Sequence, residues 1–318
     1  MLRKSVYKIG LFISILLLVN FALNSIFTTL YNSERYVSKK DALFESLKKP
    51  PKFLLIGDSH VQNSMNPQIF KNTFNYSSLN ENYIQTFYKL KYIIVNKINV
   101  PEKIILPIDL SSFTYFRAER FKYDPYWIKY VDYFEVDSVR SDNDNNNNKF
   151  IKKWIGARFF SYAGQFDFFT KLLYTKETTY KDDYLGYKPR YADYSKKKDI
   201  TRIIENRVKL YFPDERIFDE DMAFYFEKIL KICSKNNIEV ILIKMPLTKE
   251  YYEKVGERFD LADYYNKINL IARKYDNVST ISEYQTFYFN HPEYFRNPDH
   301  MNHKGATEFS KVLNKRFN

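Results

Sequence analysis

The sequence predicts an α/β protein: a three-layer sandwich with a central parallel sheet, preceded by one N-terminal transmembrane helix. Short apolar runs alternate with longer amphipathic segments, which is typical of a parallel sheet covered by helices on both faces. Near the N-terminus, an uncharged apolar stretch is long enough to cross a bilayer as one helix. With 318 residues, the chain can bury a sizeable core without disulfide or metal cross-links.

The N-terminal segment predicts where the protein lies. Arg3, Lys4 and Lys8 precede residues 9–33, none of which is charged. By the positive-inside rule these cations hold the N-terminus in the cytoplasm and send the rest of the chain to the other side. We therefore predict a single-pass protein of the cytoplasmic membrane, with an extracytoplasmic domain.

The alternative for this segment is a cleaved signal peptide. Its apolar run is long for a signal peptide, and Ala22-Leu23-Asn24 makes a poor cleavage site. A retained anchor is favoured, with residues 1–8 cytoplasmic and residues 9–31 in the membrane.

Composition narrows the classes of partner. The chain has 50 Lys and Arg against 38 Asp and Glu, a net charge of +12, which suits a polyanion or an anionic membrane surface. Because the domain is expected outside the cytoplasm, the predicted partner is an envelope glycan or anionic polymer, and nucleic acid is not expected. Cys233 is the only cysteine, which rules out an intrachain disulfide and a Cys-rich zinc site.

After a charged spacer at residues 32–51, residues 52–318 form the predicted domain. Its expected strands are the apolar runs 53–56, 103–108, 238–243 and 277–281, and its expected helices are 83–96, 219–235, 260–275 and 304–315. Residues 116–201 break this rhythm and are interpreted as an insertion or cap; their run of Asn and Asp at 143–148 predicts a loop tip.

The sequence Gly57-Asp58-Ser59-His60 directly follows the first predicted strand. In parallel α/β sheets this is where ligand sites form, and a serine there has the position of a nucleophile. The simpler interpretation is a helix N-cap made by Asp58 or Ser59.

A second motif changes that balance. The segment Asn297-Pro-Asp-His-Met-Asn-His-Lys-Gly-Ala306 precedes the last amphipathic helix, so His300 lies on a loop that can reach over the sheet to Ser59. Together the two motifs resemble the SGNH/GDSL hydrolase superfamily, which has a Gly-Asp-Ser block near the start and Asp-x-x-His near the end. The resemblance covers about residues 52–317, without the insertion.

Within that superfamily, Ser59-His-x-x-x-x-x-Asn66-Pro67 and His300-Met-Asn-x-x-Gly305-Ala306 are similar to the membrane-anchored cell-envelope branch. That branch includes D-alanine transfer and alginate O-acetylation proteins. The resemblance implies that Ser59 is the nucleophile and His300 the general base.

One departure concerns the third catalytic residue. Asn297 occupies the position at which the family has Asp, and Asp299 is adjacent to His300. Three possibilities remain open: Asp299 supplies the carboxylate, Ser59 and His300 act as a dyad oriented by a backbone carbonyl, or the site is degenerate.

A second departure concerns the oxyanion donors. Beside the Ser59 amide, the resemblance implies a donor block near residues 75–80, which lacks a glycine, and a third after the 103–108 strand, where Asp109 stands in place of Asn. A carboxylate accepts hydrogen bonds unless it is protonated, so Asn80 is the better candidate than Asp109. Asp58 and His60 are candidates for lining the substrate pocket.

No metal site and no cofactor are expected, because the sequence has no His-Glu-x-x-His, no carboxylate cluster at metal spacing and no glycine-rich phosphate loop. The expected function is serine-dependent esterase or O-acyltransferase chemistry on an envelope glycan, and resemblance implies a multipass membrane O-acyltransferase as partner. The alternative is a catalytically degenerate protein of this fold that serves as an envelope assembly or glycan-binding factor.

Overall fold

A computed structural model describes residues 2–33, 36–119, 126–131, 135–136, 159, 162, 184–213 and 217–318. The chain divides into two compact units. The first comprises residues 1–39 and 123–180, and the second comprises residues 40–122 and 181–318.

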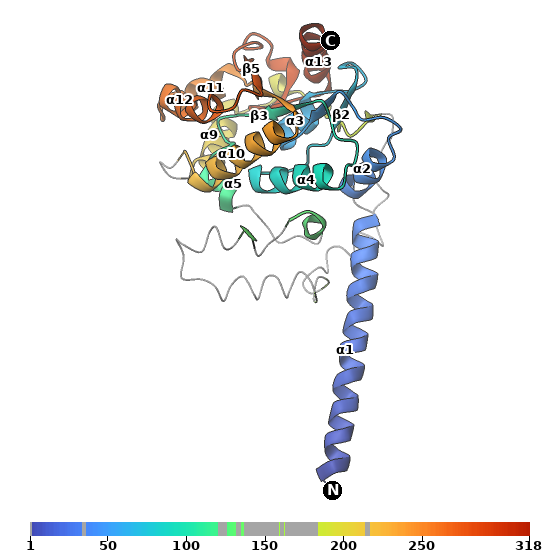
Figure 1. Cartoon of the computed structure of the whole chain (residues 1–318). Helices are drawn as coiled ribbons and strands as arrows, with labels where there is room; N and C mark the ends of the chain where they lie inside the picture. The colour runs from blue at the N-terminus through green and yellow to red at the C-terminus, as the bar shows by residue number, and fades with distance from the viewer. Residues whose placement is uncertain are drawn as a thin grey trace. The chain divides into compact units, whose positions relative to one another are not determined.

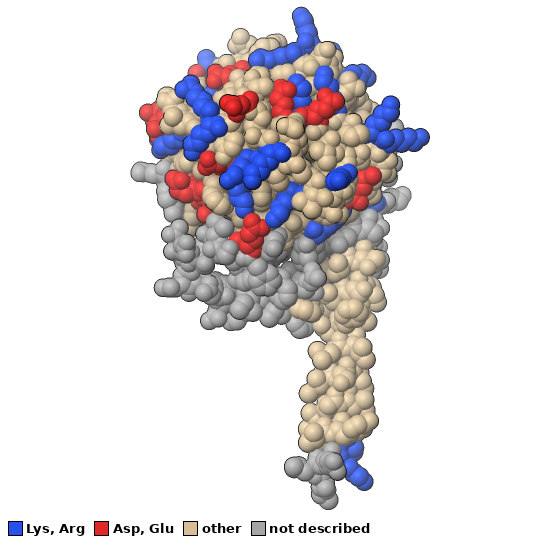
Figure 2. Space-filling model, viewed as in Figure 1, with Lys and Arg blue, Asp and Glu red and all other residues tan. Residues whose placement is uncertain are grey.

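The first unit contains α1 (Leu2–Ser33), whose segment Lys4–Thr29 is long and apolar enough to cross a membrane. These 26 residues make a helix about 39 Å long, more than the hydrocarbon thickness of a bilayer. Figure 2 shows an uncharged surface along most of this helix. A helix long and apolar enough to span a membrane is therefore present where it was predicted, while its retention as an anchor and its orientation stay predictions.

The second unit is built on a five-stranded sheet in the order β2-β1-β3-β4-β5, in which every neighbouring pair is parallel. Figure 1 shows helices on both sides of this sheet. The strands are β1 (Phe53–Leu55), β2 (Thr73–Asn75), β3 (Lys103–Pro107), β4 (Glu239–Lys244) and β5 (Val278–Glu283). The predicted fold class is confirmed: a central parallel sheet flanked by helices and preceded by an apolar helix.

Alternation along the strands separates the two faces of the sheet, because successive side chains point to opposite sides. Phe53, Leu55 and Ile105 share a buried cluster with residues of α3 and α13, such as Val61 and Phe309. The neighbouring strand residues then face the opposite layer, which includes α4 and α10, two helices that pack against each other.

The helices of the second unit are α3 (Ser59–Ser64), α4 (Tyr83–Val95), α5 (Tyr115–Glu119), α9 (Ile200–Tyr211), α10 (Glu220–Lys235), α11 (Lys249–Gly256), α12 (Leu261–Ala272) and α13 (His303–Phe317), with 3₁₀ turns η3 (Tyr194–Lys196) and η4 (Pro292–Tyr294). A short hairpin joins β6 (Phe295–Asn297) to β7 (His300–Met301). Cys233 is buried on α10. The described part of the first unit also holds the 3₁₀ turn η1 (Trp127–Lys129).

Helix α2 (Tyr36–Glu45) lies where the sequence suggests a spacer. From Lys40 onward it belongs to the second unit, and Lys40 and Phe44 are fully buried there. Part of this segment is therefore folded into the core that carries the site.

The predicted insertion at residues 116–201 is divided between the units. Its ends, 116–122 and 181–201, belong to the second unit, and residues 123–180 belong to the first. The Asn and Asp run at 143–148 lies outside the described residues. On the visible face of the second unit, Figure 2 shows Lys and Arg intermixed with Asp and Glu, so that face carries no single basic patch.

Candidate active site

The strand order places the site. In the order β2-β1-β3, the chain leaves β1 toward one edge of the sheet and returns past it to β3, so a crevice opens beyond the ends of β1 and β3. Asp58 and Ser59 follow β1, and Asp109 follows β3. Both segments therefore meet at the position where open parallel sheets bind ligands.

The turn after β1 depends on Gly57. Its φ of 129° disfavours any side chain, and an added Cβ would lie 2.7 Å from Pro107 Cγ on the neighbouring strand segment. Asp58 then caps α3, accepting a hydrogen bond from the His60 amide at 2.9 Å. Ser59 becomes the first residue of the helix, and its side chain stands at the end of the sheet.

The segment that carries His300 is held by the β6–β7 hairpin and by the N-cap of α13. Asn297 and His300 pair across the β6–β7 hairpin. Asn302 caps α13 by accepting from the Gly305 amide at 3.0 Å, and its own amide group donates to the Phe295 carbonyl at 3.1 Å. A Cβ on Gly305 would lie 2.2 Å from the Tyr294 carbonyl oxygen, so only glycine fits this approach.

These two segments bring Ser59 and His300 together. Ser59 Oγ lies 2.7 Å from His300 Nε2, and both residues are buried. This is the distance at which an imidazole can take the proton of a hydroxyl nucleophile.

The other nitrogen of His300, Nδ1, has three polar neighbours. Asp299 Oδ1 lies at 3.0 Å, Asn297 Oδ1 at 3.2 Å and Arg207 Nη2 at 3.0 Å. The two oxygens only accept hydrogen bonds, and the guanidinium only donates. A proton on Nδ1 therefore bonds to the carboxylate and leaves Nε2 free to act as a base, whereas a proton on Nε2 leaves Nδ1 to accept from Arg207.

Asp299 is the stronger partner for that nitrogen. Burial favours its neutral form, but the two nearby imidazoles and the Arg207 guanidinium hold its pKa well below the usual range. The hydrogen bond to a carboxylate is charge-assisted, while the one to the Asn297 amide is not. Of the three possibilities that the sequence leaves open, this geometry fits the one in which Asp299 supplies the carboxylate.

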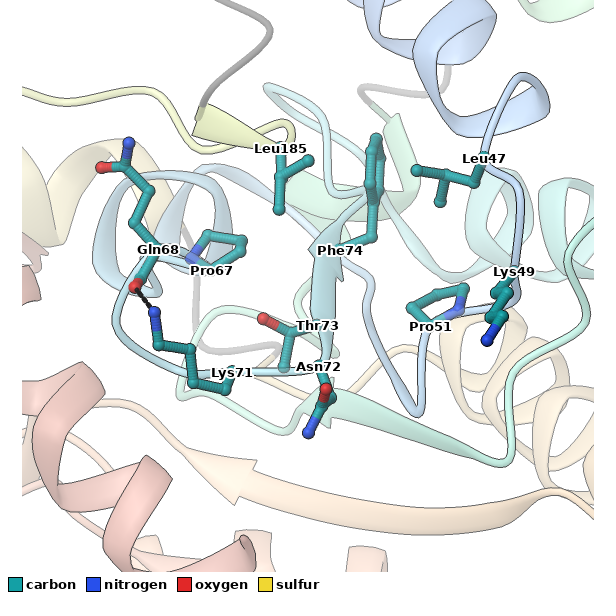
Figure 3. Close-up of a pocket in the computed structure, with 10 residues that line it drawn as sticks. All are labelled: Leu47, Lys49, Pro51, Pro67, Gln68, Lys71, Asn72, Thr73, Phe74 and Leu185. Atoms are coloured by element: carbon teal, nitrogen blue, oxygen red, sulfur yellow. Dashed lines mark hydrogen bonds between the residues drawn. The ribbon is translucent and has the colours of Figure 1, made fainter.

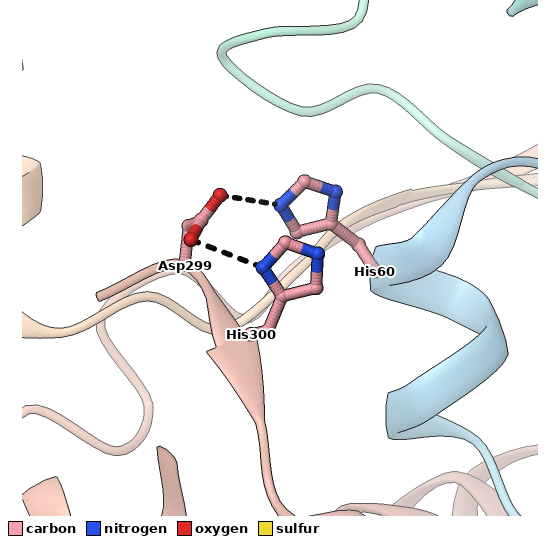
Figure 4. Close-up of side chains that lie close together, drawn as sticks. All are labelled: His60, Asp299 and His300. Atoms are coloured by element: carbon pink, nitrogen blue, oxygen red, sulfur yellow. Dashed lines mark hydrogen bonds and ion pairs between the residues drawn. The ribbon is translucent and has the colours of Figure 1, made fainter. Parts of the chain in front are cut away.

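His60 occupies an unusual position between two carboxylates. Its Nδ1 lies 2.9 Å from Asp58 Oδ2, and its Nε2 lies 3.1 Å from Asp299 Oδ2. Figure 4 shows Asp299 reaching one imidazole with each oxygen, with the rings of His60 and His300 side by side. His60 is thus a buried member of this charge network.

The pKa values of the two histidines move in opposite directions. Burial lowers the pKa of His300 to about 3; Asp299 acts to raise it, and the charges of His60 and Arg207 act to lower it. For His60, burial also disfavours the cation, but Asp58 and Asp299 raise its pKa to about 10. At neutral pH the charged ring is His60, and His300 is neutral, as a general base must be.

Two arginines complete the network. Arg117 on α5 is buried and donates from Nη2 to Asp58 Oδ2; Arg207 on α9 donates from Nε to Asp299 Oδ1 at 2.8 Å. Both guanidinium groups lie near the Tyr211 ring, at 5.4 and 4.8 Å from its centroid. Sequence reasoning missed both arginines, since no motif marks them. Arg207 is on the same helix as Tyr211, but Arg117 is on α5, far away in sequence, so nothing joins the three residues before the fold is known.

The loop at residues 75–80 does not present its first amides to the site. The amide of Tyr76 donates to the Leu55 carbonyl at 2.8 Å, and that of Ser78 donates to the Gly57 carbonyl at 2.9 Å. Asn80 is exposed, with a left-handed φ of 57°, and no hydrogen bond of the described residues joins it to Ser59 or His300. Its role as an oxyanion donor stays a prediction.

Two buried lysines donate hydrogen bonds to backbone carbonyls of this loop. Lys89 donates to the Tyr76 carbonyl at 2.9 Å and to Glu81 at 2.6 Å, and Lys40 of α2 donates to the Ser77 carbonyl. Burial lowers the pKa of Lys40 to about 7. Lys40, on the helix that follows the apolar N-terminal helix in sequence, therefore helps to hold this loop.

Asp109 lies beside this network without a full set of partners. Its Oδ1 accepts from the Met245 amide at 2.8 Å, and its Oδ2 is buried without a hydrogen bond among the described residues, 3.9 Å from His60 Nδ1. Burial raises its pKa to about 6. Only the protonated form of Asp109 can donate a hydrogen bond.

Two sets of three side chains lie close enough to share a metal ion: His60 with Asp299 and His300, and Asp58 with His60 and Asp109. Sequence spacing did not reveal them, because they come together only in the fold. Both sets depend on His60, whose two nitrogens each face a carboxylate as donors. A protonated imidazole has no lone pair for a metal, so the hydrogen-bond network fits these residues better.

One groove of the second unit is separate from this network. It has a volume of about 470 Å³ and lies between the segment after α2 and the outer strand β2, as Figure 3 shows. It is lined by Leu47, Lys49, Pro51, Pro67, Gln68, Lys71, Asn72, Thr73, Phe74 and Leu185. None of the predicted site residues contributes to its wall.

Comparisons with known proteins leave the family open. No protein-family model matches the chain, and no curated protein matches it significantly. A solved structure described as "The structure of a putative platelet activating factor from Streptococcus pneumonia" is similar over 91% of this chain and 94% of that chain, at 12% identity and a TM-score of 0.39. A likeness this distant carries no argument about activity, so the resemblance to the SGNH/GDSL superfamily stays a prediction. Any functional proposal for this chain therefore rests on the geometry of the site.

Proposed function

We propose that the protein is a serine-dependent O-acyl esterase or O-acyltransferase, with Ser59 as nucleophile, His300 as general base and Asp299 as the orienting carboxylate. The observation that carries the proposal is the 2.7 Å contact between Ser59 Oγ and His300 Nε2, with Asp299 on the other nitrogen of the same ring. A nucleophile, a base and an orienting group in that order are the geometric signature of acyl transfer.

In the first half of the reaction, Ser59 Oγ forms a bond to the acyl carbonyl carbon while its proton passes to His300 Nε2. The Ser59 amide is one available donor to the resulting oxyanion, since no hydrogen bond of the described residues uses it. When the bond to the alcohol oxygen breaks, His300 returns the proton to that oxygen, and the acyl group stays on Ser59.

In the second half, water or a sugar hydroxyl gives its proton to His300 Nε2 and attacks the acyl carbon. The bond from that carbon to Ser59 Oγ then breaks, and His300 returns the proton to Oγ. Water as acceptor makes the protein an esterase, and a hydroxyl makes it a transferase. The apolar helix α1 supports transfer, because an anchor holds the site beside a membrane acyl donor. The acceptor we propose is an envelope glycan or polymer, and the donor partner a multipass O-acyltransferase.

This proposal includes an N-terminus in the cytoplasm and a domain outside it, supported by Arg3, Lys4 and Lys8 ahead of the uncharged stretch. Protease added to spheroplasts should then digest the domain and leave a membrane-held N-terminal fragment. A protected domain, or a mature N-terminus that starts after Ser33, would contradict it.

The contact between Arg207 and His300 Nδ1 favours a second candidate, a non-catalytic glycan-binding protein. If Arg207 donates a hydrogen bond to Nδ1, the imidazole proton is on Nε2, and His300 cannot accept the proton of Ser59. A serine-reactive fluorophosphonate separates the two functions: intact-mass analysis should show one adduct on the wild-type chain and none on Ser59→Ala. Equal labelling of both proteins, or none of either, would favour the binding protein.

A further inference from the structure

We propose that Arg190, Arg207 and Arg296 form an anion-binding subsite beside Ser59 and His300, so that the ester substrate carries a phosphate or carboxylate close to its scissile bond. This inference rests on the proposed function for the identity of the ester, and on the arrangement of the three guanidinium groups for the anion.

The three arginines come from different segments and converge on the reacting pair. Arg190 donates from Nε to Asn63 Oδ1 at 3.3 Å, and Asn63 in turn donates to the Ser59 carbonyl. Arg190 therefore lies against the first turn of the helix that carries the nucleophile.

Arg207 reaches the base from the other side, through its contacts with Asp299 Oδ1 and His300 Nδ1. Arg296 is on β6, one residue before Asn297, which pairs with His300 across the hairpin. Arg207 therefore contacts the base and its carboxylate, Arg190 reaches the nucleophile's helix through Asn63, and Arg296 adjoins the strand pair of His300.

The positive charge in this cluster exceeds what the described residues neutralise. Burial lowers the pKa of Arg296, and the charges of Arg190 and Arg207 act on it as well. Asp299 is the carboxylate that acts on Arg296, and it is already shared with Arg207 and His60. Lys188 lies in the same electrostatic environment, since burial and the charges of Arg190 and Arg296 lower its pKa too.

One donor in the cluster is left without an acceptor. Arg296 Nε is buried, and no described residue accepts a hydrogen bond from it. A buried donor on a cation is costly to leave unpaired, and a planar guanidinium fits the oxygens of phosphate or carboxylate in pairs. An oxyanion from the substrate would meet both needs, the missing acceptor and the missing negative charge.

The test compares three acetate esters of similar size: 3-acetoxypropyl phosphate, 4-acetoxybutanoate and the uncharged 3-acetoxypropanol. The full-length protein in detergent should show a higher kcat/KM for one or both anionic esters, and the preferred anion distinguishes phosphate from carboxylate. Arg296→Gln should lower the ratio of anionic to neutral kcat/KM about tenfold, the usual effect of losing a charge-assisted hydrogen bond. Added salt should lower the wild-type ratio in the same direction.

Arg202→Gln is the matched control. Arg202 is on the same helix as Arg207 but is exposed and pairs only with the exposed Asp199 among the described residues. Its substitution should leave the ratio unchanged. If Arg296→Gln does not fold, Arg296→Lys and the salt dependence of the wild type carry the test, because both alter anion recognition without removing the charge.

Phenyl phosphate binding to Ser59→Ala, measured by calorimetry, separates this inference from the proposed function. Binding that Arg296→Gln abolishes, in a protein whose wild type cleaves no ester, would uphold the subsite and overturn the esterase. Ester cleavage with equal rates for charged and neutral esters, and no phenyl phosphate binding, would uphold the esterase and overturn the subsite.

Discussion

The imidazole rings of His60 and His300 stack on each other, with 4.2 Å between their centroids and 16° between their planes. Two stacked rings cannot both be cations without strong repulsion. Asp58 and Asp299 contact His60 from both sides, which places the charge on His60 and leaves His300 neutral. His60 therefore acts electrostatically on His300, the histidine that contacts Ser59.

Removing the charge of His60 should change the pKa of the general base, His300. In His60→Gln, the pKa of His300 should rise, because a neighbouring cation that lowers it is gone. The acid limb of the kcat/KM profile should move upward by about one pH unit or more, and the buried carboxylates left without His60 should cost about 3 to 5 kcal/mol of unfolding free energy. Rate profiles and urea unfolding measure the two effects.

The exposed His291, which pairs with Glu293, offers the control. His291→Gln should change the unfolding free energy by less than about 0.5 kcal/mol and leave the rate profile in place. An acid limb that stays unchanged in His60→Gln would refute the electrostatic role.

The wild-type pH profile should also differ from that of an ordinary histidine base. Since the pKa of His300 is lowered to about 3, kcat/KM should not show the usual histidine step near pH 6.5. The raised pKa of Asp109, about 6, and the lowered pKa of Lys40, about 7, fall in the same range, so Asp109→Asn and Lys40→Met should be measured in parallel to remove these contributions. A step near pH 6.5 that persists in both variants would show that His300 is not held neutral.

The same shift has a consequence for stability. The folded pKa of His300 lies below the unfolded value, so below about pH 6.5 the unfolded chain binds a proton that the folded one does not. The contribution of His300 to the unfolding free energy is therefore present above about pH 6.5 and is lost as the pH falls toward 3. Urea unfolding of wild type and His300→Gln at pH 7 and 5 should show the wild type losing more stability.

The third catalytic position can be assigned by exchange of two side chains. Asp299→Asn should lower kcat by up to about 10⁴, the loss that follows when the orienting carboxylate of a serine triad becomes an amide. Asn297→Asp should do little or do harm, because it puts a second negative charge beside Asp299. Small effects from both would indicate a dyad, and a gain from Asn297→Asp would give that position the orienting role.

The turn before Ser59 should tolerate no side chain. Gly57→Ala places a Cβ against Pro107 at a positive φ, and we expect a loss of about 1 to 3 kcal/mol in unfolding free energy together with reduced activity. Gly256→Ala is the control, since its Cβ would meet only Leu261 Cδ1 at 3.6 Å. Equal stability of the two variants would contradict this view of the turn.

The sheet was predictable because its strands are buried on both faces. Runs such as 103–108 and 238–243 lack the alternation of exposed strands, and they became β3 and β4 nearly residue for residue. Strand β2 was missed, since Thr73–Asn75 is too short to carry a pattern. Its place at the edge of the sheet comes from pairing with β1, which local sequence does not encode.

Within the site, the two motifs identified the side chains that meet, but not what surrounds them. The Gly57 turn and the loop before α13 are local features, so Ser59 and His300 could be named in advance. Asp299 was one of three possibilities, because the choice depends on how the hairpin turns its side chain. Arg117 and Arg207 come from remote helices, and no local pattern marks a residue whose role is to balance buried charge.

The most direct test of the central claim is the turnover of a small acetate ester by wild type and Ser59→Ala, both as full-length protein in detergent. We predict that the wild type cleaves the ester and passes through an acetyl adduct on Ser59, visible by mass spectrometry after rapid acid quench. Ser59→Ala should show neither adduct nor turnover above the buffer rate. Turnover by Ser59→Ala equal to that of the wild type would contradict catalysis by this site.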